Sequence, residues 1–258
     1  MQQDADGRWR GKSLRATDVS RSFDGVEALA EVTIEIGRDE VIGLIGPNGA
    51  GKTTLINLIT GFDLPSSGSI ELEQQEITFW NAHRRARAGL SRTFQHGHMF
   101  RDLSVSENVE LAALGVGMKA SRARERRAEL LHALGLEGRE QAPASMLSHG
   151  EEQKLGVARA LASEPSYVLM DEPAAGLSDS DVEAFSALVH AVHSEHGAGV
   201  LVVDHNVALI MNVCDRIYVL NEGRVVGEMQ AAEASQEKIM RAIVCGEIRD
   251  EQLERAAS

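Results

Sequence analysis

A glycine-rich stretch at residues 46–54 has the residue types and spacing of a phosphate-binding loop. It reads Gly-Pro-Asn-Gly-Ala-Gly-Lys-Thr-Thr and fits the pattern G-x-x-x-x-G-K-[ST]. Its glycines allow backbone N–H groups to turn inward around a polyphosphate, and a following helix N-terminus adds partial positive charge. We expect Lys52 to contact the β- and γ-phosphates of a nucleotide and Thr53 to bind Mg²⁺. The nucleotide-binding residues predicted here are Gly46, Pro47, Asn48, Gly49, Ala50, Gly51, Lys52, Thr53 and Thr54.

The sequence around this stretch supports that interpretation. An apolar run at residues 41–45 precedes it and is typical of a buried strand. Residues 55–59 follow it and read as the first turns of a helix with an apolar face. A chance glycine-rich turn is the alternative, but the strand–loop–helix order is the context that the motif requires.

Two adjacent carboxylates follow a second apolar run, at residues 167–170. An aspartate at a strand end holds Mg²⁺ in phosphoryl-transfer sites, so we predict that Asp171 binds the metal opposite Thr53. The neighbouring Glu172 points elsewhere and is a candidate general base for an attacking water. An acidic strand end that merely caps a helix is the alternative, but the phosphate loop upstream and Pro173 downstream favour the catalytic interpretation.

Composition limits the classes of protein that fit. The chain has 258 residues, enough for one large or two small domains, and 26 basic against 39 acidic residues give a net charge of −13. Such an acidic balance argues against nucleic acid as a partner. The two cysteines, Cys214 and Cys245, lack a metal-ligand spacing and are expected to be free thiols. No apolar run reaches the ~18 residues of a membrane span, so a cytoplasmic protein is expected, and any pore must come from other chains.

Short apolar strands alternate with helices along the chain, which predicts an α/β fold with a mostly parallel sheet. The phosphate loop, Asp171, Glu172 and His205 all follow predicted strands and should meet at one sheet edge. Strands are expected at residues 14–23, 32–36, 41–45, 69–72, 90–94, 167–170, 200–203, 216–220 and 224–228. Helices are expected at residues 81–88, 151–162, 179–196, 206–212 and 231–245, with two or three more between 105 and 136. The basic run within residues 122–127 reads as a solvated helix face, with a partner surface as the alternative.

The order of these motifs resembles the nucleotide-binding subunit of ATP-binding cassette (ABC) transporters. The matching residues are the phosphate loop, Gln95, Leu147-Ser148-His149-Gly150-Glu151, Asp171-Glu172-Pro173 and His205. The resemblance implies a P-loop NTPase with a mostly parallel sheet core, an antiparallel β lobe and an inserted helical subdomain. It places the nucleotide-binding domain at residues 12–246, the helical subdomain at about 99–163 and a charged tail at 247–258. It also implies a dimer that holds each ATP between the phosphate loop of one subunit and the signature loop of the other.

The resemblance assigns roles residue by residue. Phe23 lies where the family places an aromatic that stacks on adenine, although a strand-end core residue is the alternative. Gln95 resembles the glutamine that contacts Mg²⁺ or water and links the two lobes, and His205 resembles the histidine that contacts the γ-phosphate. Ser148 and Gly150 retain the hydroxyl and the close backbone approach of the signature loop.

This chain departs from the common signature Leu-Ser-Gly-Gly-Gln. His149 replaces a glycine, Glu151 replaces the glutamine, and Ser178 stands where the family often has aspartate. Glu151 favours the start of the helix but repels a nearby phosphate unless its carboxylate points away. These departures suit a heterodimer with a different second ATPase subunit.

A narrower resemblance is to the ATPases of branched-chain amino-acid importers. It rests on residues 89–95, 99–109, 171–177 and 215–220, while the Leu-Ser-His-Gly signature also resembles urea and short-amide importers. The family then implies ATP and Mg²⁺, a second ATPase subunit, two membrane permeases docked at residues 95–108, and indirect action with a solute-binding protein. The chain would lie on the inner face of the cell membrane.

Other interpretations remain open at this stage. One is an exporter or a lipopolysaccharide-extraction ATPase of the same fold. Another is a soluble ABC ATPase acting in iron–sulfur assembly or on the ribosome, and a third is an ATP-binding regulator without turnover. The sequence determines neither the solute nor whether the dimer has identical subunits.

Overall fold

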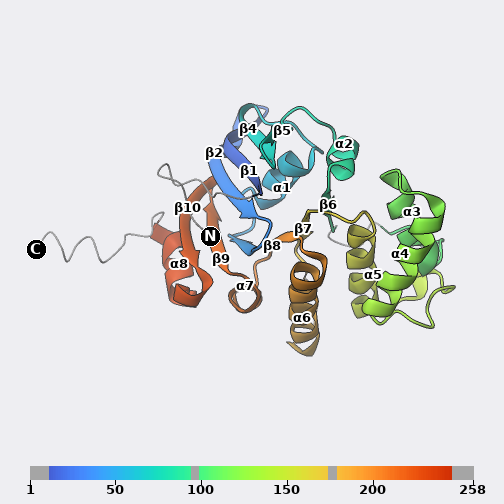
Figure 1. The fold of residues 1–258 in the computed structure, drawn as a ribbon. Coiled ribbons are helices and arrows are strands. Elements are labelled where there is room, and N and C mark those ends of the chain that lie inside the picture. Colours follow the sequence, from blue (N-terminus) through green and yellow to red (C-terminus); the bar gives the residue numbers. More distant parts are fainter. Residues whose placement is uncertain (1–11, 94–98, 174–178, 246–258) are drawn as a thin grey trace, which may run out of the picture.

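The computed structural model describes residues 12–93, 99–173 and 179–245. Figure 1 shows two sheets that lie against one another, with a group of helices at one end of the molecule. Among the described residues, no helix has the length and apolar character needed to cross a bilayer.

The central sheet has six strands in the order β10-β9-β3-β8-β7-β6. All neighbouring pairs are parallel except β9 and β10, which form a hairpin. Its strands are β3 (Val41–Ile45), β6 (Leu90–Arg92), β7 (Tyr167–Asp171), β8 (Gly199–Val203), β9 (Arg216–Asn221) and β10 (Arg224–Gln230). Every residue of β3, β7 and β8 is buried, because alternate side chains enter two separate apolar clusters on opposite faces of the sheet. The predicted mostly parallel sheet is confirmed.

A second, antiparallel sheet has the strand order β2-β1-β4-β5. It consists of β1 (Ser13–Phe23), β2 (Val26–Gly37), β4 (Ser67–Leu72) and β5 (Gln75–Glu76). Strand β2 begins at Val26, well before the expected residue 32, because Asp24 and Gly25 form a tight hairpin turn with φ of 47° and 85°. The inward side chains of this sheet share an apolar cluster with those of one face of the central sheet.

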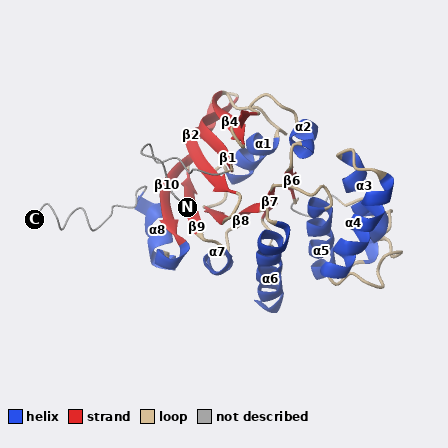
Figure 2. Ribbon diagram, in the orientation of Figure 1, coloured by secondary structure: helices blue, strands red, loops and turns tan. Residues whose placement is uncertain are grey.

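Some helices pack against the central sheet, and α3, α4 and α5 form a group beyond its β6 edge (Figure 2). They are α1 (Lys52–Thr60), α2 (Ala82–Arg87), α3 (Val105–Gly115), α4 (Ala120–Ala133), α5 (His149–Leu161), α6 (Asp179–His196), α7 (Val207–Val213) and α8 (Gln236–Cys245), with 3-10 turns at Ala144–Met146 and Ala231–Glu233. Helices α3, α4 and α5 pack together away from the antiparallel sheet. The helix expected over residues 231–245 is split, because Ser235 accepts a hydrogen bond from the Lys238 N–H and starts a new helix.

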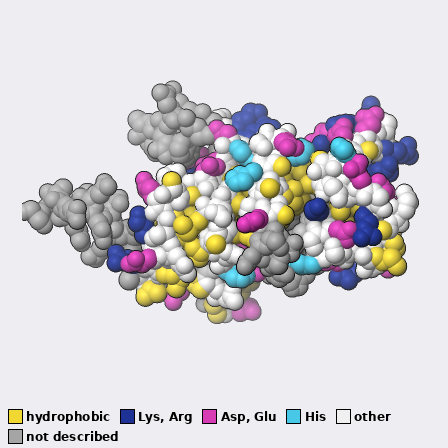
Figure 3. Space-filling view, turned by 90° about the horizontal axis from the view of Figure 1, so that it is seen from below, with side chains coloured by type: hydrophobic (Ala, Val, Ile, Leu, Met, Phe, Trp, Pro, Cys, Tyr) yellow, Lys and Arg dark blue, Asp and Glu magenta, His cyan; other side chains and the backbone are white. Residues whose placement is uncertain are grey.

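The basic run lies on α4 and forms ion pairs within the molecule. Arg122 lies 2.7 Å from Glu164, and Arg127 lies 2.9 Å from Glu110. Figure 3 shows basic and acidic side chains mixed at this end of the molecule. The expectation of a solvated face is wrong for Arg126, which is 9% exposed and donates to the Leu161 carbonyl.

A buried arginine on α2 fixes the C-terminal end of α1. Arg85 is 0% exposed. Its guanidinium donates to the carbonyls of Leu58 and Ile59, both at 2.6 Å, and to those of Thr78 and Trp80. Burial lowers the pKa of Arg85 to about 10, which leaves it charged at neutral pH. Its positive charge complements the helix dipole of α1, the helix that follows the phosphate loop.

Candidate functional site

The glycine-rich loop joins the end of β3 to the start of α1, as the motif requires. A Cβ atom on Gly46 would lie 2.1 Å from the Leu220 carbonyl oxygen, and one on Gly51 would lie 2.7 Å from that of Ala28. Gly51 also has a φ of 103° and forms the N-cap of α1. Both positions therefore require glycine, and the loop is held tightly against neighbouring strands.

The Lys52 side chain is held over this loop by the backbone carbonyls of the loop. Its Nζ donates to the carbonyls of Gly46 at 2.7 Å and Pro47 at 2.9 Å, and the residue is 6% exposed. Burial lowers the pKa of Lys52, while the charges of Glu172 and Asp171 oppose that shift. The charges of Glu172, the predicted general base, and Asp171, a predicted metal ligand, therefore both act on the Lys52 amine. Thr53, the next residue, is exposed beside it.

The carboxyl ends of β7 and β8 bring the other predicted residues to the same edge. Strands β7 and β8 are neighbours, so Asp171 and Glu172 lie beside Asp204 and His205. Asp171 is 3% exposed and Asp204 is 0% exposed, whereas the His205 side chain is 60% exposed. His205 Nδ1 lies 3.6 Å from an Asp204 oxygen. Two buried carboxylates therefore lie beside an exposed imidazole at this edge.

Glu172 has a backbone conformation that glutamate rarely adopts. Its φ is 45°, and its N–H donates to the Val203 carbonyl at 2.7 Å. A left-handed residue other than glycine costs on the order of 1–3 kcal/mol and is often retained at functional sites. The turn ends the strand directly after Asp171, so the two adjacent carboxylates belong to different backbone conformations.

The donor set at this edge suits Mg²⁺. A threonine hydroxyl and a carboxylate are hard oxygen ligands, the kind that Mg²⁺ prefers. Mg²⁺ usually takes only a few ligands from the protein, and phosphates and water provide the others. Among the residues that the structure describes, no cluster of three or more His, Cys, Asp or Glu could hold a metal. Thr53 and Asp171 remain the predicted protein ligands here. Gln95, predicted as a third ligand and a catalytic residue, lies outside the described residues.

Phe23 is not a core residue, because it is 43% exposed at the end of β1. The Arg21 guanidinium lies 4.5 Å from the centre of its ring. Arg21 thus lies over the ring as a cation–π partner, and part of the ring remains accessible. Adenine stacking on Phe23 stays a prediction.

The signature residues start α5. Ser148 is the N-cap, and its N–H and hydroxyl both donate to one carboxylate oxygen of Glu151, at 2.8 and 2.9 Å. Arg139 donates to the other oxygen at 2.8 Å. The Ser148 groups, and then Arg139, lower the pKa of Glu151. The carboxylate therefore turns back on the helix start and carries its own counter-charge. The exposed Ser148 and the half-buried Gly150 belong to this helix start, at the end of the molecule formed by α3, α4 and α5.

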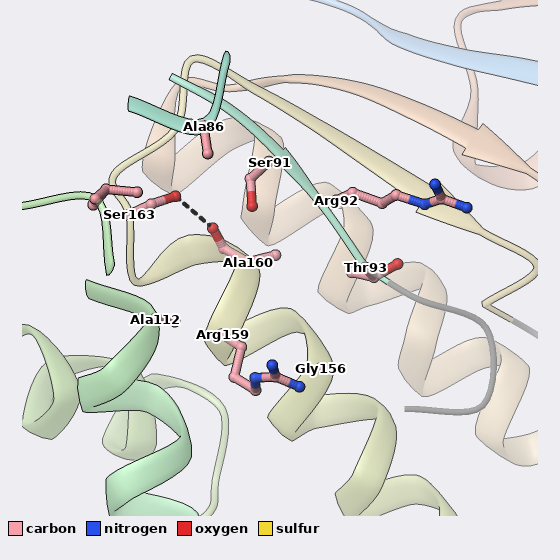
Figure 4. Close-up of a pocket in the computed structure, with 10 residues that line it drawn as sticks. Ala86, Ser91, Arg92, Thr93, Ala112, Gly156, Arg159, Ala160 and Ser163 are labelled. Carbon is pink, nitrogen blue, oxygen red and sulfur yellow. Dashed lines mark hydrogen bonds between the residues drawn. The ribbon is translucent and has the colours of Figure 1, made fainter. Parts of the chain in front are cut away.

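A cavity of about 180 Å³ lies between β6, α3 and α5. Figure 4 shows residues that line it, including Ser91, Thr93, Gly156, Arg159 and Ala160. The chain runs from β6 to α3 through the stretch at residues 95–108, in which permease docking is predicted. Thr93, which precedes that stretch, and Ala112 and Val116, which follow it, line this cavity.

Sequence reasoning missed Asp204, described above, and one basic residue at the site. Arg92, on β6, donates to Asp171 Oδ2 and to Asn57 Oδ1, each at 2.7 Å. No local sequence pattern indicates either contact, because Asp171 lies 79 residues and Asn57 lies 35 residues from Arg92 in the chain.

Comparisons with known proteins match this geometry. Residues 29–175 match the family described as "ABC transporter". The chain is 36% identical over 225 residues to the high-affinity branched-chain amino acid transport ATP-binding protein LivG of Escherichia coli, covering 81% of this chain and 88% of LivG. It is 33% identical over 234 residues to the lipopolysaccharide export system ATP-binding protein LptB of Acidithiobacillus ferridurans, covering 91% and 97% of the two chains.

Solved structures of ABC transporter cassettes have a fold similar to that of this chain. One ATP-binding cassette of an ABC transporter has a TM-score of 0.82 at 26% identity, covering 92% of this chain and 99% of that one. A dimeric cassette in a post-hydrolysis state, bound to ADP and Pi, has a TM-score of 0.76 at 26% identity, covering 84% and 98%.

Proposed function

The chain belongs to the ABC transporter family and is an ATPase, and from this premise we propose that it powers an importer of branched-chain or other hydrophobic amino acids. The observation that carries the proposal is the similarity to LivG over most of both chains. It agrees with the separate resemblance of residues 89–109 to branched-chain amino-acid importers. The chain would act from the cytoplasmic face of the membrane.

The site supports hydrolysis of ATP by water. Phe23 would stack on adenine, and the loop N–H groups and the Lys52 amine would hold the phosphates. Mg²⁺, bound through Thr53, Asp171 and Gln95, would neutralise phosphate charge. Glu172 would accept the proton of the attacking water, and His205 would contact the γ-phosphate.

A second ATPase subunit would complete each site. Ser148 and Gly150 would contact the γ-phosphate of the ATP held by that partner's phosphate loop. The dimeric cassette bound to ADP and Pi supports this arrangement, which remains a proposal for this chain. The internal pairing of Glu151 with Arg139 reduces the repulsion that its charge would otherwise impose on that phosphate.

Each of the two ATPase subunits would dock one permease subunit at residues 95–108, next to the cavity between β6, α3 and α5. Gly156 offers a direct test, because a Cβ added there meets no atom within 4 Å. Phenylalanine would fill the cavity without straining the backbone, whereas alanine would leave most of it open.

The test is a pull-down from native membranes with a tagged Glu172→Gln chain and MgATP. We expect two different permeases and a second ATPase as partners. Adding Gly156→Phe should remove the permeases and retain the second ATPase, and Gly156→Ala should retain all of them. Capture of soluble partners alone would contradict the transporter assignment.

The similarity to LptB favours lipopolysaccharide export as the second candidate. The same pull-down separates the two, because an importer should bring a solute-binding protein and an exporter should bring lipopolysaccharide-transport components. Urea or short-amide import differs only in the partner proteins and the solute. An iron–sulfur assembly ATPase would bring soluble partners.

A further inference from the structure

Arg92 connects three elements at the nucleotide site. From β6 its guanidinium reaches Asp171 on β7 and Asn57 on α1, both at 2.7 Å. The pair is buried, with 9% of the arginine side chain and 3% of the aspartate side chain exposed. A buried, charge-assisted pair of this length fixes the orientation of both groups.

The contact divides the Asp171 carboxylate between two tasks. Its Oδ2 accepts from Arg92, which leaves Oδ1 for a metal or its water. Asn57 lies four residues after Thr53 on α1, so both lie on one face of that helix. The guanidinium therefore ties Asp171 to the same helix face that carries the other predicted metal ligand.

Lys52 is a second cation near Asp171, and its amine donates to the Gly46 and Pro47 carbonyls. Asp171 is one of the charges that raise the pKa of Lys52. Without Arg92, the buried Asp171 would have the Lys52 amine as a nearby cation and would be free to rotate toward it. Such a rotation would turn the carboxylate away from a metal beside Thr53.

The side chains of Ser91 and Arg92 leave β6 in different directions. Ser91, Arg92 and Thr93 all line the cavity between β6, α3 and α5, and the Arg92 guanidinium extends away from Ser91 and Ala160 (Figure 4). Alternation of side chains along a strand places Arg92 toward α1 and β7. The contacts with Asn57 and Asp171 therefore come from the Arg92 side chain.

We propose that Arg92 is a positioning residue that orients Asp171 for Mg²⁺. The proposal rests on the proposed function, in which Mg²⁺ and ATP bind at this edge. It assigns to Arg92 an effect on metal-dependent nucleotide binding that is separate from the binding of the phosphates by the loop.

The test measures ATP affinity of the purified chain by calorimetry, over a series of MgCl₂ concentrations and in EDTA. We expect Arg92→Gln to raise the Mg²⁺ concentration for half-maximal enhancement of ATP binding about 10-fold, the size of effect typical for a residue that orients a metal ligand. Affinity in EDTA should stay within about 2-fold of wild type, because the loop contacts do not involve Arg92.

Two variants separate geometry from charge. Arg92→Lys keeps the charge but has one amine in place of a planar fork, so it should show most of the defect. Asn57→Ala removes one anchor of the fork and should give a smaller shift in the same direction. Arg15→Gln, which breaks an ion pair with Glu35 at 2.8 Å on the antiparallel sheet, should leave the Mg²⁺ dependence unchanged.

An unchanged Mg²⁺ dependence in Arg92→Gln would overturn the proposal. A shift to lower Mg²⁺ concentrations, or full rescue by Arg92→Lys, would also overturn it, because the arginine would then act only as a charge. Wild-type protein that binds no ATP would instead contradict the proposed function, and the two failures are thus distinguishable.

Discussion

Replacing Glu172 with glutamine is expected to preserve ATP binding and to reduce steady-state hydrolysis about 100-fold or more. An amide has nearly the same size as the carboxylate but does not accept the proton of the attacking water, and a positioned general base contributes roughly 10²–10⁴-fold. The measurement is phosphate release at saturating MgATP, with ATP affinity determined by calorimetry on the same preparations.

A matched control is available for this substitution. Glu164 also has a left-handed backbone, with a φ of 50°, but it pairs with Arg122 at the helical end of the molecule. Glu164→Gln should retain wild-type turnover. Steady-state hydrolysis at the wild-type rate by Glu172→Gln would show that another group activates the water.

Replacing Lys52 with alanine is expected to weaken ATP binding about 10- to 100-fold. The buried amine is held over the loop by the Gly46 and Pro47 carbonyls, so it is already positioned for phosphate. A hydrogen bond to a charged group contributes about 1.5–3 kcal/mol, which corresponds to that range of affinity. Calorimetric titration with ATP in EDTA tests the effect without the metal.

The control for this variant is a lysine outside the site. Lys238 donates to the Glu233 carbonyl near the start of α8, and Lys238→Ala should bind ATP as the wild type does. Equal ATP affinity in Lys52→Ala and wild type would contradict the phosphate-loop assignment.

The sequence was most informative where a feature is local. The phosphate loop is one contiguous motif, and the apolar run before it coincides with β3, while α1 begins at Lys52, ahead of the apolar run at residues 55–59. The shared edge of Asp171 and His205 followed from the rule that parallel strands end together. Both features needed no knowledge of distant contacts.

Features that depend on local turn chemistry were visible but missed. Asp24 and Gly25 favour a hairpin turn, which explains why β2 begins at Val26 and not at the expected residue 32. Ser235 is a common N-cap type, yet one continuous helix was expected across it. In both places a single turn or capping residue decides where an element begins.

Contacts between distant side chains were beyond prediction. Arg92 meets Asp171 only because β6 and β7 are neighbours, and Arg126 is buried only because α4 packs beside α5. The pairing of Glu151 with Arg139 likewise required the helix start and the preceding loop to be placed in space, whereas its contact with Ser148 is a local capping box. Tertiary packing decides these interactions.

Uptake of radiolabelled leucine into proteoliposomes tests the central claim most directly. The vesicles would contain the complex captured with this chain, with ATP enclosed and the solute-binding protein outside. We predict leucine accumulation that requires ATP and is lost with Glu172→Gln. ATP hydrolysis by the same complex without leucine accumulation, accompanied by extraction of lipopolysaccharide from the vesicles, would contradict the importer assignment.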